Sequence, residues 1–335
     1  MFKFDLTLEN LKRGLSNPYQ LFDEIVLQHG YRVPSTVYNA RRGIGTNIFS
    51  REWDLLIILD CCRVDALREL APEYDFIEGV GSLRSVGGST PEWTSNTFTP
   101  EYREEIQQTA YVSGTAQVRA ILKETRPENT GVFGGHIAYN LLRYCDTVDI
   151  TDLGHVDYAF EYELPEDVVD EHPKGKIPPR YITDRAVRTA REREPDRLML
   201  HYMQPHGPYS ASAVGEDRDL NKLEERPLRY LRNTGEMEAV WEAYLDEIRY
   251  ALDDVEIVMN NIDADKVVIT ADHGEAFGEY GIYGHTVGSL HPQVRNVPWA
   301  VTSATDRETY TPIIDQEDET EESTDELLEA LGYKV

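Results

Sequence analysis

An acid and an imidazole lie side by side at positions 272 and 273, and this pair is the strongest chemical signal in the sequence. Asp272 and His273 follow a β-branched run at residues 267–270, which is typical of a strand buried on both faces. In an open α/β sheet, ligands bind at the edge where parallel strands end. A carboxylate oxygen and an imidazole nitrogen can bind the same divalent cation. The pair therefore indicates a metal site, and its alternative is an ordinary polar loop after a strand.

A second acid follows another apolar run. Residues 55–59 predict a buried strand, and Asp60 comes directly after it. Cys61 and Cys62 come next, where a helix would open. Two alternatives exist for this segment, an aspartate that caps the helix and a reactive cysteine. We favour Asp60 as the chemically active residue of this segment.

Two hydroxyls precede a predicted helix at residue 91. Residues 79–99 are rich in Gly, Ser and Thr and read as a loop. Within it, Thr90 could cap the helix, Pro91 fits its first turn, and Glu92 suits the positive end of the helix dipole. A hydroxyl at this point lies where backbone N–H groups can bind an anion. Ser89 is therefore a candidate nucleophile, and a simple helix cap is the alternative.

Two further histidines follow strands or glycines in loops. His206 lies in a proline-rich loop after an apolar run at residues 197–201, and His285 follows Gly284 beyond the Asp-His pair. Oxygen and imidazole ligands together suit Zn²⁺, Mn²⁺ or Mg²⁺. A metal beside a hydroxyl lowers its pKa and makes it a nucleophile near neutral pH. The combination serves hydrolysis or group transfer at a tetrahedral phosphorus or sulfur.

The elements that would position these residues alternate between apolar strands and amphipathic helices. This order predicts an α/β fold with a mostly parallel central sheet and helices on both faces. We expect helices over residues 106–125, 180–194 and 236–262, and further strands over residues 131–133, 147–150, 197–201 and 297–301. We expect a helical and loop extension at residues 1–50, a catalytic domain at residues 51–310, and an acidic C-terminal tail with a short helix at residues 311–335.

The composition limits the classes of partner. The 335 residues carry 61 acidic and 33 basic side chains, a formal net charge of −28. Such a surface repels nucleic acid and suits a protein that is soluble in concentrated salt, so we expect a halophilic source and no nucleic-acid partner. Three cysteines make no disulfide framework. No secretory signal and no apolar run of roughly 20 residues are visible, so we expect no membrane span and a cytoplasmic location.

Across residues 53–301 the sequence resembles the alkaline phosphatase and sulfatase superfamily. LDCCRVDAL resembles its first metal-binding aspartate segment, GGSTPEW its nucleophile loop, and MQPHGPY the Pro-His-x-Pro-Tyr loop of sulfatases. The most specific block is TADHGEAFGEYGIYGH, which follows a long predicted helix. The resemblance implies an alkaline-phosphatase-like fold and a cofactor of one or two divalent ions, Zn, Mn, Mg or Ca.

The resemblance also implies roles for individual residues. Asp60, Asp272 and His273 would bind metal together with the nucleophile oxygen, and His206 and His285 would bind a second metal or the transferring group. The spacing to Pro91 favours Ser89 as nucleophile, while some phosphotransferase relatives use a threonine, which makes Thr90 the alternative.

The implied function is metal-dependent hydrolysis of a sulfate or phosphate ester of a small molecule or glycan. The sequence departs from the sulfatase pattern at Glu92 and Trp93, where Ser-Arg is usual, and at His285, where lysine is usual. The alternatives are a phosphotransferase or mutase of the same superfamily and a non-catalytic protein that binds an anion or glycan.

Overall fold

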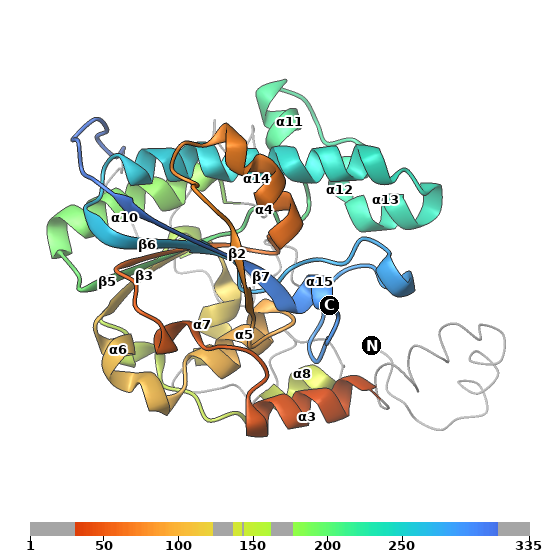
Figure 1. Ribbon diagram of the computed structural model, residues 1–335, viewed down its shortest axis with the longest axis horizontal. Coiled ribbons are helices and arrows are strands. Elements are labelled where there is room, and N and C mark those ends of the chain that lie inside the picture. The colour runs from red at the N-terminus through yellow and green to blue at the C-terminus, as the bar shows by residue number, and fades with distance from the viewer. Residues whose placement is uncertain (1–30, 123–136, 143, 162–176, 314–335) are drawn as a thin grey trace.

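A seven-stranded sheet runs through the centre of the molecule (Figure 1). The computed structural model describes residues 31–122, 137–142, 144–161 and 177–313. The strands are β1 (Leu55–Leu59), β2 (Gly81–Arg84), β3 (Thr109–Ser113), β4 (His155–Tyr158), β5 (Arg197–Tyr202), β6 (Ala264–Thr270) and β7 (Asn296–Ala304). Their order is β2-β7-β6-β1-β5-β3-β4, in which β7 pairs antiparallel with β6 and β2 pairs antiparallel with β7. The other pairs are parallel, which confirms the predicted mostly parallel sheet.

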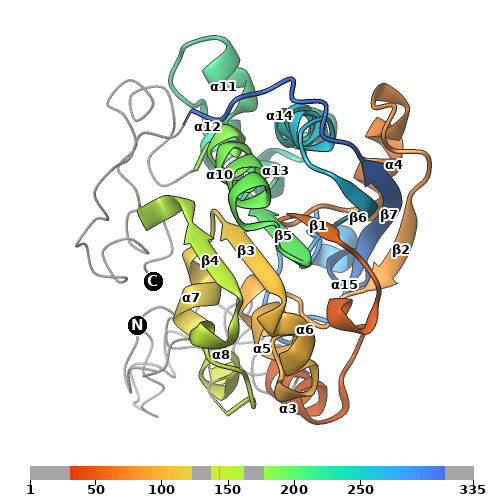
Figure 2. The same cartoon turned by 90° about the vertical axis from the view of Figure 1, so that its left-hand side faces the viewer.

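Helices cover both faces of the sheet, as expected (Figures 1 and 2). On one face lie α4 (Val64–Leu70), α10 (Pro179–Arg193) and α14 (Met237–Met259). On the other lie α3 (Val33–Arg42), α5 (Thr90–Thr97), α6 (Arg103–Gln107), α7 (Ala116–Leu122) and α8 (Ile137–Leu142). Three helices, α11 (Ala211–Gly215), α12 (Lys222–Glu225) and α13 (Pro227–Thr234), follow β5, and the short α15 (Pro292–Arg295) precedes β7. None of the described helices has the length and apolar character that crossing a bilayer requires.

The central strands form where the sequence is most continuously apolar. Every residue of β1 is buried, and so is the apolar end of β6. In the parallel register, Ile58 lies opposite both His201 and Thr270. The carboxyl ends of β1, β5 and β6 are therefore level with one another at the middle of the sheet.

Three expectations about the elements were wrong. The helix expected over residues 106–125 is interrupted by β3, because Thr109–Ser113 is rich in β-branched and aromatic residues and fills a buried strand position. The strand expected at residues 147–150 is absent from the described chain, where a 3-10 turn at Ile150–Asp152 leads into β4. The loop expected over residues 79–99 contains the edge strand β2.

The remaining elements agree with the sequence or cannot be compared. Helices α10 and α14 and strands β5 and β7 lie where they were expected. The strand expected at residues 131–133 and most of both terminal segments lie outside the described residues. The described part of residues 1–50 includes α3, whose Asn39 side chain donates hydrogen bonds to the Val86 carbonyl and to Glu92.

Candidate metal centre

The ends of the neighbouring strands β1 and β6 bring the first two acids together. Asp60 follows β1 by one residue and Asp272 follows β6 by two. Because Ile58 is level with Thr270, continuing the register places Asp60 level with Asp272. His273 comes next, and a Cβ on the following Gly274 would collide with the Gln293 carbonyl oxygen. Only glycine permits this close backbone approach directly after the Asp-His pair.

Three oxygen atoms surround the Nε2 atom of His273. Asp272 Oδ2 lies 3.4 Å from it, Asp60 Oδ1 3.5 Å and Thr90 Oγ1 3.4 Å. A tetrahedral cation with bonds of about 2.0–2.2 Å holds its ligand atoms roughly 3.3–3.6 Å apart. Each of the three contacts to His273 Nε2 therefore has the spacing of two ligands on one metal ion. The sequence analysis grouped Asp60, Asp272 and His273 with a loop hydroxyl, for which it favoured Ser89 over Thr90.

The proton on His273 leaves the correct nitrogen free for a cation. Nδ1 of His273 lies 3.0 Å from the Gly274 carbonyl oxygen. A carbonyl oxygen can only accept, so Nδ1 carries the proton and donates it. The lone pair is then on Nε2, which faces Asp60, Asp272 and Thr90. A second hydrogen bond of this kind is typical of metal-binding histidines.

The electrostatics of the site favour a bound cation. Asp60, Asp272 and His273 are at most 1% exposed. Within the described chain, both carboxylate oxygens of Asp60 and Oδ2 of Asp272 have no hydrogen-bond partner. Burial, reinforced by Asp272, raises the pKa of Asp60 well above its usual range, and burial lowers the pKa of His273. Buried carboxylates that lack partners are costly unless they bind a metal, and the donor set fits a divalent ion.

A second group of ligand-type side chains adjoins the first. Cys61, His206 and His285 each place one ligand atom within 4.8 Å of the others. The ring centroids of His206 and His285 are 5.3 Å apart, and those of His273 and His285 are 4.3 Å apart. Both carboxylate oxygens of Glu275 contact His285 Nδ1, at 3.1 and 3.2 Å. Burial alone would lower the pKa of His285, but the nearby carboxylates of Glu275, Asp60 and Asp272 raise it to about 9.

The sequence analysis did not include His201 and Glu275 in the site. His201, the penultimate residue of β5, has its Nδ1 2.9 Å from the Tyr111 hydroxyl and its Nε2 3.9 Å from Asp272 Oδ2. Burial lowers its pKa to about 4, so this ring is neutral. Asp60, His201 and Asp272 form a further group with metal-ligand spacing. Two features of the sequence could have pointed to them. His201 ends an apolar predicted strand, and Glu275 comes two residues after His273.

The two hydroxyls of the candidate nucleophile loop differ in position. Helix α5 begins at Thr90, so Ser89 occupies the N-cap position, and its side chain makes no capping hydrogen bond. The expectation that Thr90 caps the helix was wrong, because its hydroxyl faces His273 instead. The Ser89 hydroxyl is buried and has no hydrogen-bond partner within the described chain. Burial raises the pKa of Tyr139, and Ser89 partly offsets that rise.

Glu92 holds this loop in place rather than only complementing a helix dipole. One of its oxygens accepts hydrogen bonds from the backbone N–H groups of Gly88 and Gly288, both at 2.9 Å, and the other accepts from Asn39. The carboxylate is 1% exposed and lies 3.5 Å from the Arg295 guanidinium. Glu92 therefore ties the hydroxyl-bearing loop to α3 and to the segment after His285.

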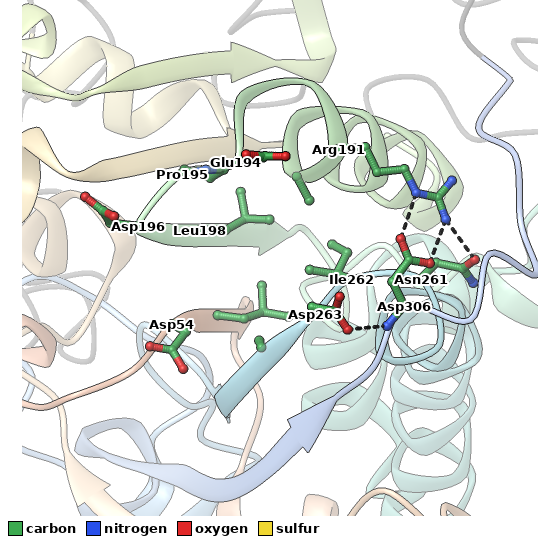
Figure 3. Close-up of a pocket in the computed structure, with 13 residues that line it drawn as sticks. Asp54, Arg191, Glu194, Pro195, Asp196, Leu198, Asn261, Ile262, Asp263 and Asp306 are labelled. Carbon is green, nitrogen blue, oxygen red and sulfur yellow. Dashed lines mark hydrogen bonds and ion pairs between the residues drawn. The ribbon is translucent and has the colours of Figure 1, made fainter.

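A separate pocket of about 440 Å³ lies at the opposite edge of the sheet (Figure 3). It opens where β1, β5 and β6 begin, and its wall includes Asp54, Asp196 and Asp263. On one side Arg191 forms an ion pair with Asp306 and donates a hydrogen bond to Asn261. This pocket shares no residue with the metal centre.

Comparison with known proteins finds similarity among solved structures. No protein-family model matches the chain, and no curated protein matches it. The soluble domain of lipooligosaccharide phosphoethanolamine transferase A from Neisseria meningitidis matches at 15% identity over 78% of this chain and 79% of that one, with a TM-score of 0.48. The periplasmic domain of a phosphoethanolamine transferase from Campylobacter jejuni matches at 14% identity over 74% and 78%, with a TM-score of 0.45. A putative sulfatase from Bacteroides thetaiotaomicron matches at 13% identity over 74% and 64%, with a TM-score of 0.43.

Proposed function

We propose that the chain is a metal-dependent enzyme of the alkaline phosphatase and sulfatase superfamily that cleaves a phosphate or sulfate ester. The observation that carries the proposal is the spacing around His273 Nε2, which lies 3.4–3.5 Å from Asp60, Asp272 and Thr90 oxygens. These four side chains would hold one divalent cation. The geometry favours Thr90, rather than Ser89, as the hydroxyl that attacks the ester.

The mechanism assigns each group a task. The cation, when bound, lowers the pKa of the attacking hydroxyl and offsets negative charge at the reacting oxygen. The Thr90 hydroxyl gives its proton to water, and its oxygen attacks phosphorus or sulfur. The ester oxygen leaves with the electron pair of its bond and takes up a proton from water, and the phosphoryl or sulfuryl group is held on Thr90 until an acceptor takes it. His206 and His285 lie on the adjoining side of the site and would contact the oxygens of the transferring group. Water as acceptor completes hydrolysis, and an alcohol completes transfer to a new ester.

A substrate panel tests this proposal. Aryl phosphate monoesters, aryl phosphate diesters and an aryl sulfate are each incubated with the purified chain, in the presence of Zn²⁺, Mn²⁺, Mg²⁺ or Ca²⁺, at low and high salt. We expect one ester class to be turned over, only with a divalent metal, and turnover to be lost in Asp272→Asn. A protein that binds the metal and cleaves none of these esters would support the non-catalytic alternative and overturn the proposal.

A further inference from the structure

We propose that His201 is a positioning residue of the metal centre, which presents its Nε2–H to the cation-facing oxygen of Asp272, and that the Tyr111 hydroxyl fixes the ring for this task. The inference deepens the proposed function, because it concerns the same cation site. It rests on the binding of that cation and does not depend on which ester is cleaved. Hydrogen-bond donors behind a metal-binding carboxylate set the orientation of that ligand.

The two carboxylate oxygens of Asp272 have different surroundings. Oδ1 accepts a hydrogen bond of 2.8 Å from the His273 backbone N–H. Oδ2 lies 3.4 Å from His273 Nε2, on the side where the cation would bind, and 3.9 Å from His201 Nε2. Within the described chain, neither Asp272 Oδ2 nor His201 Nε2 has a hydrogen-bond partner, and both side chains are fully buried. A ring nitrogen and a carboxylate oxygen that both lack partners therefore lie next to each other beside the metal site.

The contact with Tyr111 places the proton of His201. The Tyr111 hydroxyl lies 2.9 Å from His201 Nδ1. A neutral imidazole has one N–H and one acceptor nitrogen, so a hydroxyl that donates to Nδ1 leaves the proton on Nε2. The reverse arrangement would point the Nε2 lone pair at a buried carboxylate oxygen, and two acceptors repel each other strongly where water is excluded. We therefore assign the proton to Nε2, where it is directed towards Asp272.

Packing holds the His201 ring in this orientation. The Trp93 ring, on α5, meets the His201 ring edge to face with centroids 5.7 Å apart, and the centroid of the Tyr111 ring lies 6.3 Å away. All three side chains are at most 2% exposed. A metal ligand keeps its geometry when the residues behind it are fixed by packing and hydrogen bonds. His201 meets this condition, because aromatic rings from α5 and β3 enclose it.

Two other roles explain His201 less well. A histidine that binds the cation itself would need its lone pair on Nε2, which the Tyr111 contact opposes. A histidine that only fills the core would leave a buried N–H without a partner, and such a group destabilises the folded chain. An apolar side chain of similar size would serve the core better. The three roles differ in what they predict for metal binding, so experiment can separate them.

The neighbouring Tyr202 provides a matched control. It follows His201 on β5, and successive side chains of a strand point to opposite faces of the sheet. Tyr202 is fully buried, and its hydroxyl forms a hydrogen bond of 2.8 Å with Thr183 of α10, on the other face. Replacing Tyr111 or Tyr202 by Phe therefore removes the same hydroxyl from two equally buried side chains. Of these two hydroxyls, that of Tyr111 contacts the His201 ring.

The zinc affinity of the full chain tests the inference without any turnover. The Kd is measured by competition with a fluorescent chelator, for the parent and for each variant. His201→Leu removes the donor and should raise the Kd by about 10–100-fold, the usual effect of losing a donor behind a ligand. Tyr111→Phe should raise it by about tenfold, and Tyr202→Phe should leave it unchanged. His201→Gln places an amide N–H near the position of Nε2 and should recover most of the parent's affinity.

Cobalt absorption separates a positioning residue from a ligand. We expect the Co²⁺-loaded His201→Gln chain to keep the visible absorption bands of the parent, because the atoms bound to the ion are unchanged. Shifted bands would show that His201 binds the ion itself and would overturn the proposal.

Equal Zn²⁺ affinities for Tyr111→Phe and Tyr202→Phe would overturn the proposal even if the His201 variants fail to fold. A parent chain that binds no divalent ion would overturn both this inference and the proposed function. A parent chain that binds Zn²⁺, loses affinity in Tyr111→Phe and cleaves no ester would contradict the proposed function alone and support the role of His201.

Discussion

The hydroxyl oxygen of Thr90 lies 3.4 Å from Nε2 of His273, at the first residue of helix α5. This contact joins a hydroxyl to the same nitrogen that faces two buried carboxylates. The Ser89 hydroxyl, one residue earlier, is buried and has no hydrogen-bond partner within the described chain. The two adjacent hydroxyls are therefore not equivalent, and their roles can be separated by substitution.

Replacing Thr90 by Ala should abolish the covalent step, since the attacking oxygen is removed while the carboxylate and imidazole ligands stay. We expect kcat for the cleaved ester to fall by on the order of 10³-fold or more. Thr90→Ser keeps a hydroxyl and should retain measurable turnover. Ser89→Ala should stay close to the parent. Normal turnover by Thr90→Ala with an inactive Ser89→Ala would reverse the assignment.

Removing the cation should lower the thermal stability of the parent. A ligand bound only by the folded state stabilises it by about 2.7 kcal/mol at 100 times its Kd. Asp60→Asn should abolish this metal-dependent shift. Without metal the variant should be at least as stable as the parent, because it relieves repulsion between Asp60 and Asp272. Melting curves with chelator and with added Zn²⁺ measure both effects, and a parent that melts identically in the two would count against the site.

Glu92 should be a large contributor to stability. Glu92→Ala leaves the Gly88 and Gly288 N–H groups without their acceptor and the Arg295 guanidinium without its buried counter-charge. Loss of one partner of a buried ion pair destabilises by about 3–5 kcal/mol. The control is Glu101→Ala. Glu101 is exposed in the 3-10 turn Pro100–Tyr102 that follows α5, so this change should alter the free energy of unfolding by less than about 0.5 kcal/mol. Urea denaturation of the two variants gives their free energies of unfolding. Equal losses of stability would show that Glu92 does not hold the loop through these buried contacts.

Glu224 should make stability sensitive to acid. Hydrogen bonds from Arg218 lower the pKa of Glu224 below its unperturbed 4.5. Its stabilising contribution is therefore complete above pH 4.5 and is lost as the pH falls through the folded-state value. Glu224→Gln should be less stable than the parent at pH 7, and the difference should shrink towards pH 3. The Glu224 carbonyl accepts the Tyr209 N–H, so the same residue anchors the loop that carries His206. A difference that is independent of pH would exclude the Arg218 pair as its source.

Salt should stabilise the fold. With a formal net charge of −28, repulsion among carboxylates opposes folding and weakens as ions screen it. We expect the melting temperature in molar KCl to exceed that in dilute buffer. Equal melting temperatures would argue against the salt-adapted source that the composition suggests.

The sequence predicts the part of the fold that is specified by continuous local patterns. The apolar run of β1 and the periodic face of α14 identify their elements without ambiguity, because burial and local pattern agree. The strand β3 was missed because Thr109–Ser113 follows Ile106 at a spacing that also suits a helix, and its pairing partners, β4 and β5, are far along the chain. Edge strand β2 pairs only with β7, and its exposed residues carry no apolar pattern.

The same limit applies to the site. Asp60, Asp272 and His273 follow recognisable strands, so their meeting at one edge could be foreseen. The choice between Ser89 and Thr90 depends on which hydroxyl faces His273, and that depends on where α5 begins. The Cys61 thiol lies next to His273 and His285, and Cys61 has a left-handed backbone conformation. Neither residue type nor spacing predicts that conformation.

The location of a bound metal tests the central claim most directly. A crystal of the chain grown with Zn²⁺ and measured across the zinc absorption edge would show the ion as an anomalous-difference peak. We expect a strong peak with Asp60, Asp272, His273 and Thr90 as ligands at about 2.0–2.2 Å. The account would be contradicted by a crystal in which that position has no peak while zinc binds elsewhere, for example between Asp54 and Asp263 at the opposite edge of the sheet.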